Sequence, residues 1–175
     1  IYKRVEEAKG TEFLGRLGPM FVGTIHAYCF RILQDHVPRY GNYDVLDEHQ
    51  HSALISRRRY DLDLAKLHFR HWNSIEIFKR TADVIGNELL SIELLAGTDI
   101  GDCYANYLGM LERYKMLTFS MIIAKAVEVL QDDEAIYERV TGQLRHLIVD
   151  EYQDINPVQE RLIELLARPC VQLCV

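Results

Sequence analysis

The feature that most limits the fold is a long block with helical spacing of apolar residues, enclosed between two short apolar runs. The runs, 20–24 and 144–149, are nearly continuous, as is typical of buried parallel strands. Inside the block, apolar side chains recur every three to four residues, as at Ala105, Leu108 and Leu111, which indicates amphipathic helices. The sequence therefore predicts an α/β, predominantly helical protein whose chain leaves a parallel sheet, builds a helical subdomain and returns.

Capping and turn residues predict the bounds of these elements. Thr24, Asp47 and Ser74 each stand before an apolar-periodic segment, where a side-chain oxygen can accept from the first backbone amides of a helix. We expect strands over 20–24, 144–149 and 170–175, and helices over 1–8, 26–36, 48–69, 75–85, 87–95, 102–114, 118–131, 133–140 and 157–167. The sheet domain would then comprise residues 1–36 and 142–175, and the helical insertion would span 37–141.

Composition excludes several classes of protein. With 49% hydrophobic and 26% charged residues the chain can bury a core, so wholesale disorder is excluded. No uncharged apolar run approaches the roughly 18 residues of a membrane helix, and no secretory leader opens the sequence, so we expect no membrane partner. The 4 Cys residues form no CxxC pattern, which predicts a reduced, cytoplasmic protein. The formal charge of −6 restricts any nucleic-acid contact to a local basic patch.

Both ends of the sequence lie inside predicted elements. Residues 1–8 have the pattern of a helix interior without an N-cap, and residues 170–175 have that of a strand without a following turn. This pattern favours a piece of a longer protein, with frayed termini as the alternative.

The strongest chemical signal is a pair of acids that follows an apolar run. Asp150 and Glu151 come directly after Leu147–Val149, as carboxylates do at the C-terminal edge of a nucleotide-hydrolysing sheet. The first acid could hold Mg²⁺ through water, and the second could deprotonate an attacking water. The alternative is that both are solvated residues of a strand-to-helix loop.

Longer strings around this pair resemble a known family. The run VDEYQDINPVQ, residues 149–159, closely resembles the Walker B segment, motif II, of UvrD/Rep/PcrA-like superfamily 1 DNA helicases. The run VGTIHAYCFRIL, residues 22–33, is similar to the G-T-[FI]-H-[SA] segment that follows motif Ia, and YDVLD, residues 43–47, is a looser match. The resemblance covers essentially the whole chain, and it implies a partial RecA-like P-loop sheet with a large all-helical insertion.

This resemblance also implies cofactors and roles at the acidic motif. The protein would use ATP and Mg²⁺, with Asp150 as the Mg²⁺ ligand and Glu151 as the catalytic base. Gln153 and Asp154 would link the nucleotide site to the DNA track. The sequence contains no GxxxxGK[ST] loop, so residues 1–175 alone are expected not to hydrolyse ATP. No role is transferred to Leu117–Ser120, which departs from the acidic LDFDD-like segment of the family.

By the same resemblance, Thr24 and His26 would lie near the backbone of single-stranded DNA. A hydroxyl and backbone amides at a helix N-terminus suit phosphate, and an imidazole can contact phosphate or stack on a base. The alternative for His26 is a partly buried side chain that satisfies a loop carbonyl.

A basic stretch in the helical block is the second candidate DNA surface. It carries seven basic residues against three acidic ones, namely Arg57, Arg58, Arg59, Lys66, Arg70, Lys79 and Arg80 against Asp61, Asp63 and Glu76. We expect Arg57, Arg58, Arg59 and Arg70 to contact DNA phosphates, and a solvated helix face is the alternative. The nearby pairs His49/His51 and His68/His71 have no Cys beside them, so we expect no zinc site.

Two functions from different classes follow. The first is part of an ATP-dependent DNA helicase or translocase that couples ATP hydrolysis to movement on single-stranded DNA and to duplex unwinding. Its partners would be single-stranded and duplex DNA and the remaining helicase domains of the same chain. The alternative is a non-catalytic DNA-binding or protein-interaction module built on the helical insertion.

Overall fold

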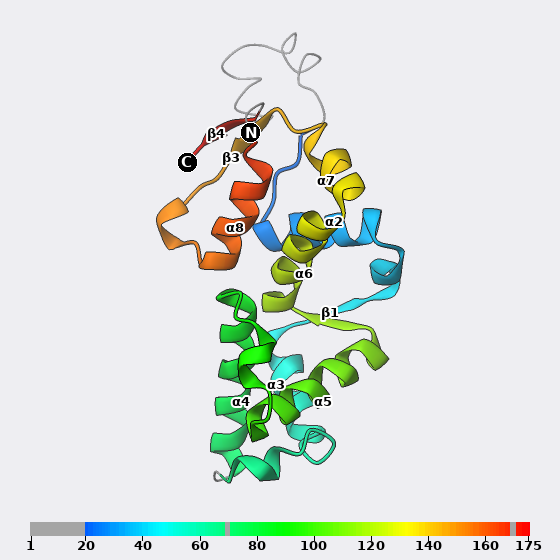
Figure 1. Ribbon diagram of the computed structural model, residues 1–175, viewed down its shortest axis with the longest axis vertical. Helices are drawn as coiled ribbons and strands as arrows, with labels where there is room; N and C mark the ends of the chain where they lie inside the picture. The colour runs from blue at the N-terminus through cyan, green and yellow to red at the C-terminus, as the bar shows by residue number, and fades with distance from the viewer. Residues whose placement is uncertain (1–19, 69–70, 169–170) are drawn as a thin grey trace.

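The computed structural model describes residues 20–68, 71–168 and 171–175 of the chain. Helices dominate it, and short strands and 3₁₀ turns connect them (Figure 1). The α-helices are α2 (Ile25–His36), α3 (Glu48–Arg57), α4 (His71–Asn87), α5 (Asp99–Tyr114), α6 (Phe119–Asp132), α7 (Glu134–Thr141) and α8 (Pro157–Leu166). The strands are β1 (Asp44–Leu46), β2 (Met116–Thr118), β3 (His146–Ile148) and β4 (Gln172–Cys174). The 3₁₀ turns are η2 (Pro38–Asn42), η3 (Leu64–Leu67), η4 (Ile92–Leu95) and η5 (Tyr152–Asp154).

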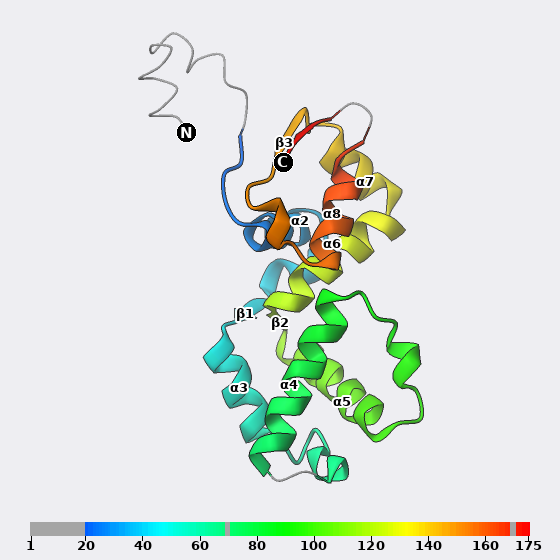
Figure 2. The same ribbon diagram turned by 90° about the vertical axis from the view of Figure 1, so that its left-hand side faces the viewer.

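Buried apolar side chains form two separate cores. The first core lies among α2, α6, α7 and α8, with Leu33, Ile123 and Leu162 at its centre. The second lies among α3, α4 and α5, with Ile55, Phe78 and Tyr107 at its centre. Figures 1 and 2 show these two groups of helices as the two halves of the molecule. We call them the sheet-side lobe and the helical lobe.

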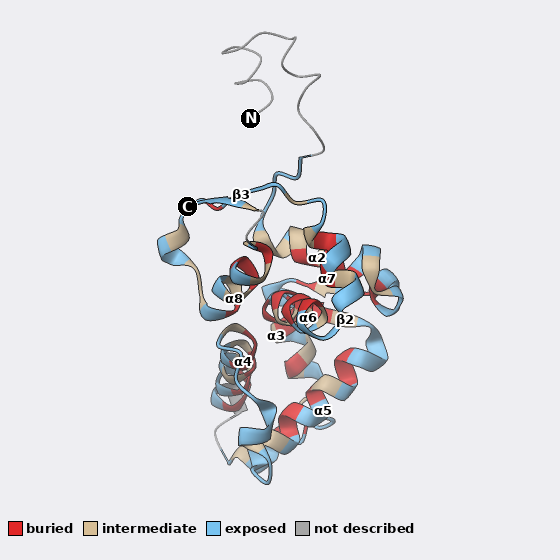
Figure 3. Cartoon of the chain, turned by 45° about the horizontal axis from the view of Figure 1, so that its top comes forward, coloured by how far each residue is buried: buried red, intermediate tan, exposed pale blue. Residues whose placement is uncertain are grey.

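Each strand pair is parallel and short. β1 pairs with β2 between the two lobes, with Val45 opposite Leu117. β3 pairs with β4 at the far end of the sheet-side lobe, with Leu147 opposite Leu173. Figure 3 shows that β3 and β4 carry mostly exposed or partly exposed residues, unlike the buried faces of α4, α5 and α6.

Several predicted elements are confirmed near their expected bounds. The Thr24 hydroxyl accepts from the Ala27 amide at 3.1 Å and begins α2, and Asp47 caps α3 in a reciprocal box with Gln50. The strands expected near 144–149 and 170–175 occur as β3 and β4, and the Pro157 helix occurs as α8. The helix expected over 1–8 lies outside the described residues.

Other predictions were wrong. Residues 20–24 belong to neither sheet of the described residues, and Met20, Phe21 and Val22 are exposed. The apolar run did not form a strand because apolar character does not supply a neighbouring strand. Instead, the Phe21 ring lies 5.2 Å from the Tyr28 ring.

The helical block is also divided differently. α3 ends at Arg57, not near residue 69, because the chain turns to bury Leu62 and Leu64 in the helical lobe, with Asp63 at a positive φ of 56°. α4 begins at His71, so Ser74 lies buried within the helix instead of capping it. In the segment 87–95, Asn87 ends α4 and the rest forms only η4. The prediction also missed β1 and β2.

No helix of the described residues is both long and apolar enough to span a membrane.

Candidate active site

The acidic motif forms a loop, residues 150–156, between β3 and α8. The loop begins where Val149, which is buried, donates its amide to the Cys174 carbonyl at 2.9 Å. Beyond this last contact with β4, Asp150 and Glu151 are exposed. The strand thus ends by presenting two carboxylates to solvent, and we call residues 150–156 the carboxylate loop.

Glu151 is held in an unusual backbone conformation. Its φ of 53° and ψ of 41° are left-handed, which costs a non-glycine residue on the order of 1 kcal/mol. Three short-range hydrogen bonds support it. The Glu151 amide donates to Asp150 Oδ1 at 3.0 Å, the Asp154 amide donates to the Glu151 carbonyl at 2.9 Å, and Gln153 Nε2 donates to the Glu151 carboxylate. The sequence-predicted pair is therefore adjacent, and Gln153 touches the carboxylate directly.

Asn156 anchors the other end of the carboxylate loop. Its side chain accepts from the Gln159 amide at 3.0 Å and caps α8, while Gln159 Oε1 accepts from the Asn156 amide. Asn156 Nδ2 also donates to Asn87 Oδ1, at the end of α4, at 3.2 Å. The loop is thus tied to β4 at one end and to the helical lobe at the other. Asp154 is exposed, and its side chain makes no hydrogen bond among the described residues.

The loop suits a hydrated metal ion better than a bare one. Within the described residues, no group of three or more His, Cys, Asp or Glu is arranged to hold a metal. Asp150 offers one exposed carboxylate, and Mg²⁺ characteristically binds through one or two carboxylates, waters and substrate phosphates. The loop therefore fits Mg²⁺ that arrives with a nucleotide. In the helical lobe, His51 is buried and its Nε2 lies 2.6 Å from the Tyr107 hydroxyl.

Thr24 and His26 lie at the start of α2. The exposed Thr24 hydroxyl accepts from Ala27, so it keeps its own proton for donation to a ligand. The His26 ring lies edge-on against Phe119, with ring centroids 5.3 Å apart. Burial lowers the pKa of His26, which favours a neutral ring near pH 7. Neither ring nitrogen bonds a loop carbonyl among the described residues, in contrast to the alternative raised from the sequence.

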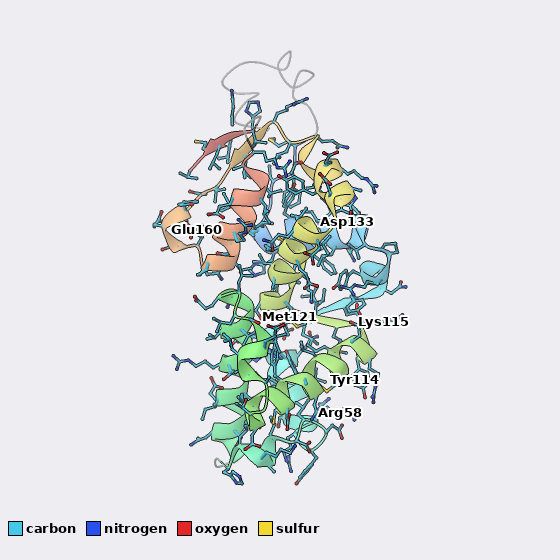
Figure 4. All side chains as sticks on the ribbon, in the orientation of Figure 1. Arg58, Tyr114, Lys115, Met121, Asp133 and Glu160 are labelled. Atoms are coloured by element: carbon cyan, nitrogen blue, oxygen red, sulfur yellow. The ribbon has the colours of Figure 1, made fainter. Side chains whose placement is uncertain are left out.

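The basic stretch is partly engaged in local contacts. Arg58 lies 3.2 Å from Asp61. Its guanidinium also lies 5.3 Å from the centroid of the Tyr114 ring, and Figure 4 shows Arg58 and Tyr114 as neighbours. The Arg59 guanidinium lies 4.4 Å over the Tyr60 ring, and Arg57 is exposed. Arg57 is the last residue of α3, and Arg58 and Arg59 follow it directly. We call residues 57–59 the basic turn. Arg70 lies outside the described residues.

The remaining cations of the stretch are engaged elsewhere or exposed. Lys66 lies 3.5 Å from both Asp63 and Asp102, and Lys79 lies 2.9 Å from Glu48. Arg80 is exposed. Two cations of the described part of the stretch, Lys66 and Lys79, are therefore already paired with acids.

Comparison with known proteins now decides the family. The model of the UvrD/REP helicase N-terminal domain matches residues 1–175. The chain belongs to this family. It is 29% identical over 164 residues to the ATP-dependent DNA helicase UvrD1 of Mycobacterium leprae (strain TN), a match that covers 85% of the chain and 21% of that protein.

Two further relatives of this UvrD/REP family chain carry the name PcrA. It is 27% identical over 175 residues to the ATP-dependent DNA helicase PcrA of Bacillus subtilis (strain 168), which covers 91% of the chain and 23% of the relative. It is 24% identical over 162 residues to PcrA of Staphylococcus aureus (strain Mu50), which covers 89% and 22%. The chain thus spans about a fifth of the length of these relatives.

Sequence reasoning missed the residues by which the helical lobe of this UvrD/REP family chain contacts the carboxylate loop. Asn87 accepts from Asn156, which ends that loop. One turn earlier on α4, Asp83 Oδ1 accepts from Ser120 Oγ of α6, rather than of the loop, at 3.2 Å. Only their spacing on α4, four residues apart, hints at a shared face. Nothing local in the sequence names their partners.

Proposed function

We propose that this UvrD/REP family chain is part of a longer ATP-dependent DNA helicase or translocase. The protein couples ATP hydrolysis to movement along single-stranded DNA and to separation of the duplex. The observation that carries the proposal is the exposed Asp150–Glu151 pair at the end of β3, with the Glu151 carboxylate oriented by Gln153. The names of the relatives, all ATP-dependent DNA helicases, support it.

The two acids have separate roles in this proposal. Asp150 would hold Mg²⁺ through water, and a bound ion would supply positive charge to the phosphates of ATP. Glu151 accepts a proton from the attacking water, and the hydrogen bond from Gln153 fixes the direction in which its carboxylate points. Asp154 lies in the same short turn as Gln153. Through this turn, a change at the nucleotide site is transmitted to the DNA track.

The short β3–β4 pair belongs to a larger RecA-like sheet in this proposal. Ile148 is 76% exposed and Leu173 is 43% exposed, although parallel strands are normally covered on both faces. Further strands and domains of the same protein cover them. Residues 1–36 and 142–175 form this motor domain and 37–141 the helical insertion, with α6 and α7 packed on the motor side.

DNA contacts start from α2. Thr24 donates to a phosphate of single-stranded DNA, and the neutral His26 ring stacks or donates a hydrogen bond beside it. The basic turn, Arg57–Arg59, adds phosphate contacts from the helical lobe. Arg70 joins them by the family resemblance.

The decisive experiment is Glu151→Gln in the whole protein that contains this chain. The substitution keeps the shape and removes the base, so DNA-stimulated ATP turnover should fall about 100-fold or more while ATP still binds. Glu160→Gln, an exposed acid in the first turn of α8, is the matched control and should retain full turnover (Figure 4). Near-normal turnover in Glu151→Gln would contradict the proposal. Residues 1–175 alone should show no turnover, since they contain no GxxxxGK[ST] loop.

A further inference from the structure

One face of α4 meets the sheet-side lobe through a short row of residues. Gly86 and Asn87 lie three and four residues after Asp83, so both neighbour Asp83 on this face of the helix. Asp83 accepts from Ser120 of α6, and Asn87 accepts from Asn156 at the start of α8, each at 3.2 Å. In Figures 1 and 2 the C-terminal end of α4 reaches the base of α8 and α6. We call these three residues the α4 seam.

Gly86 permits this close approach. A Cβ built there would lie 2.9 Å from the Ser120 Cβ and 3.2 Å from the Ser120 carbonyl carbon and oxygen. Contacts that short require α4 and α6 to move apart, because the Ser120 carbonyl carbon and oxygen belong to the backbone of α6. The seam therefore depends on a residue without a side chain at this position.

Helix α4 connects the basic turn, a proposed DNA contact, to the carboxylate loop. α3, which ends in the basic turn, packs against α4, and Glu48 of α3 lies 2.9 Å from Lys79 of α4. At its other end α4 holds Asn156, whose side chain both caps α8 and ends the loop that bears Glu151. A shift of the helical lobe thus changes the position of one anchor of that loop.

We propose that Asn87 is a positioning residue that couples the helical lobe to ATP hydrolysis through Asn156. The proposal rests on the proposed function, because it requires that Glu151 hydrolyses ATP in the whole protein. Binding of DNA to the helical lobe moves α4, and the Asn87–Asn156 hydrogen bond transmits that movement to the carboxylate loop. Asn87 itself touches neither ATP nor the reacting atoms.

The test measures a ratio in the whole protein: kcat for ATP with saturating oligothymidylate divided by kcat without it. Asn87→Leu removes the acceptor, so the ratio should fall at least about five-fold, the lower end of typical coupling between sites. Asn87→Asp keeps an acceptor for Asn156 Nδ2 and should retain most of the stimulation. A loss of folded protein lowers both rates equally and leaves the ratio unchanged, so a merely structural role does not move it.

A second pair of variants tests the same seam through the backbone. Gly86→Ala forces α4 away from Ser120 and should also lower the ratio. Gly109→Ala, on α5, is the matched control, because a Cβ there meets no atom within 4 Å. The Gly109 variant should stimulate normally.

The outcomes separate the two proposals. If ATP turnover by the whole protein does not fall in Glu151→Gln, both proposals are wrong. Glu151-dependent turnover with an undiminished ratio in Asn87→Leu and Gly86→Ala overturns this inference alone. A reduced ratio in both variants, with stimulation kept in Asn87→Asp, supports it.

Discussion

At the end of β3, the carboxylates of Asp150 and Glu151 are exposed and accept hydrogen bonds from residues one or two positions away. In the helical lobe, a polar side chain such as His51 is buried and is bound across tens of residues. The Glu151 carboxylate is bound by Gln153, two positions on. His51 of the helical lobe is bound by Tyr107, 56 positions on. Where the two lobes meet, Ser120 of α6 is bound by Asp83 of α4, 37 positions back. The two regions thus place their polar groups by different means.

The difference reflects what each region has to do. In the proposed function, a carboxylate that meets Mg²⁺, water and nucleotide has to stay exposed, and a local turn suffices to orient it. A polar group inside a core loses its water and needs a partner, because an unpaired buried donor or acceptor costs about 1–3 kcal/mol. We therefore expect substitutions in the helical lobe to lower the free energy of unfolding more than substitutions in the carboxylate loop.

Matched truncations of apolar side chains should show the largest contrast. Phe78, in the helical lobe, is 0% exposed, so Phe78→Ala should lower the free energy of unfolding by about 3–5 kcal/mol. Ile148, beside the carboxylates, is 76% exposed, and Ile148→Ala in this chain should change it by about 0.5 kcal/mol or less. Urea denaturation of both variants measures the difference. Equal losses would show that the β3 edge is as well packed as the lobe.

Charge reversal in the basic turn tests whether the helical lobe contributes to DNA binding. Changing Arg57, Arg58 and Arg59 together to Glu should weaken single-stranded DNA binding by the whole protein about 10- to 100-fold and reduce the salt slope by about 2, since each phosphate contact contributes about 0.7. Titrations at several salt concentrations measure both. The control reverses three cations elsewhere, Arg113, Lys115 and Arg139. An unchanged slope in the basic-turn variant would favour a solvated helix face.

The buried His51–Tyr107 pair should make the helical lobe acid-sensitive. Burial lowers the pKa of His51 from its usual value of 6.5. Burial also raises the pKa of Tyr107, so its hydroxyl stays protonated beside the neutral His51 ring. The unfolded chain then binds the His51 proton more readily than the folded one. The contribution of neutral His51 to the free energy of unfolding is therefore fully present above pH 6.5. It is lost as the pH falls below that value, by at most about 1.4 kcal/mol per pH unit.

The measurement compares unfolding free energies from pH 7.5 down to 5 for the unaltered chain and for His51→Gln. The Gln variant removes this titration and should show a shallower decline, although other groups still titrate in both proteins. Parallel curves for the two proteins would mean that His51 does not titrate differently on folding.

The smallest effect is expected at the helix cap beside the sheet-side lobe. Thr24→Ala removes the acceptor for the Ala27 amide and should cost about 1 kcal/mol of stability. Thr24→Ser keeps the hydroxyl and should be close to the unaltered protein. Thermal unfolding of the two variants separates loss of the cap from loss of the methyl group, and a larger effect of Ser than of Ala would contradict the capping role.

Local contacts explain which parts of this protein could be predicted from its sequence. Thr24, Asp47 and Asn156 cap their helices with amides three residues on, and Asp150 and Glu151 follow a strand in a string specific to the family. Such contacts need only neighbouring residues, so the pattern of the chain determines them. The acidic motif, its turn and the start of α8 belong to this class.

Tertiary structure decided the rest. Residues 20–24 have the pattern of a strand but lie outside both sheets of the described residues, and Ser74 has the identity of a cap but lies within α4. β1 pairs with β2, and Asn87 with Asn156, across long stretches of chain. Whether such groups meet depends on how the two lobes pack, because the hydrogen-bonding partner of each lies on an element that the local sequence does not specify.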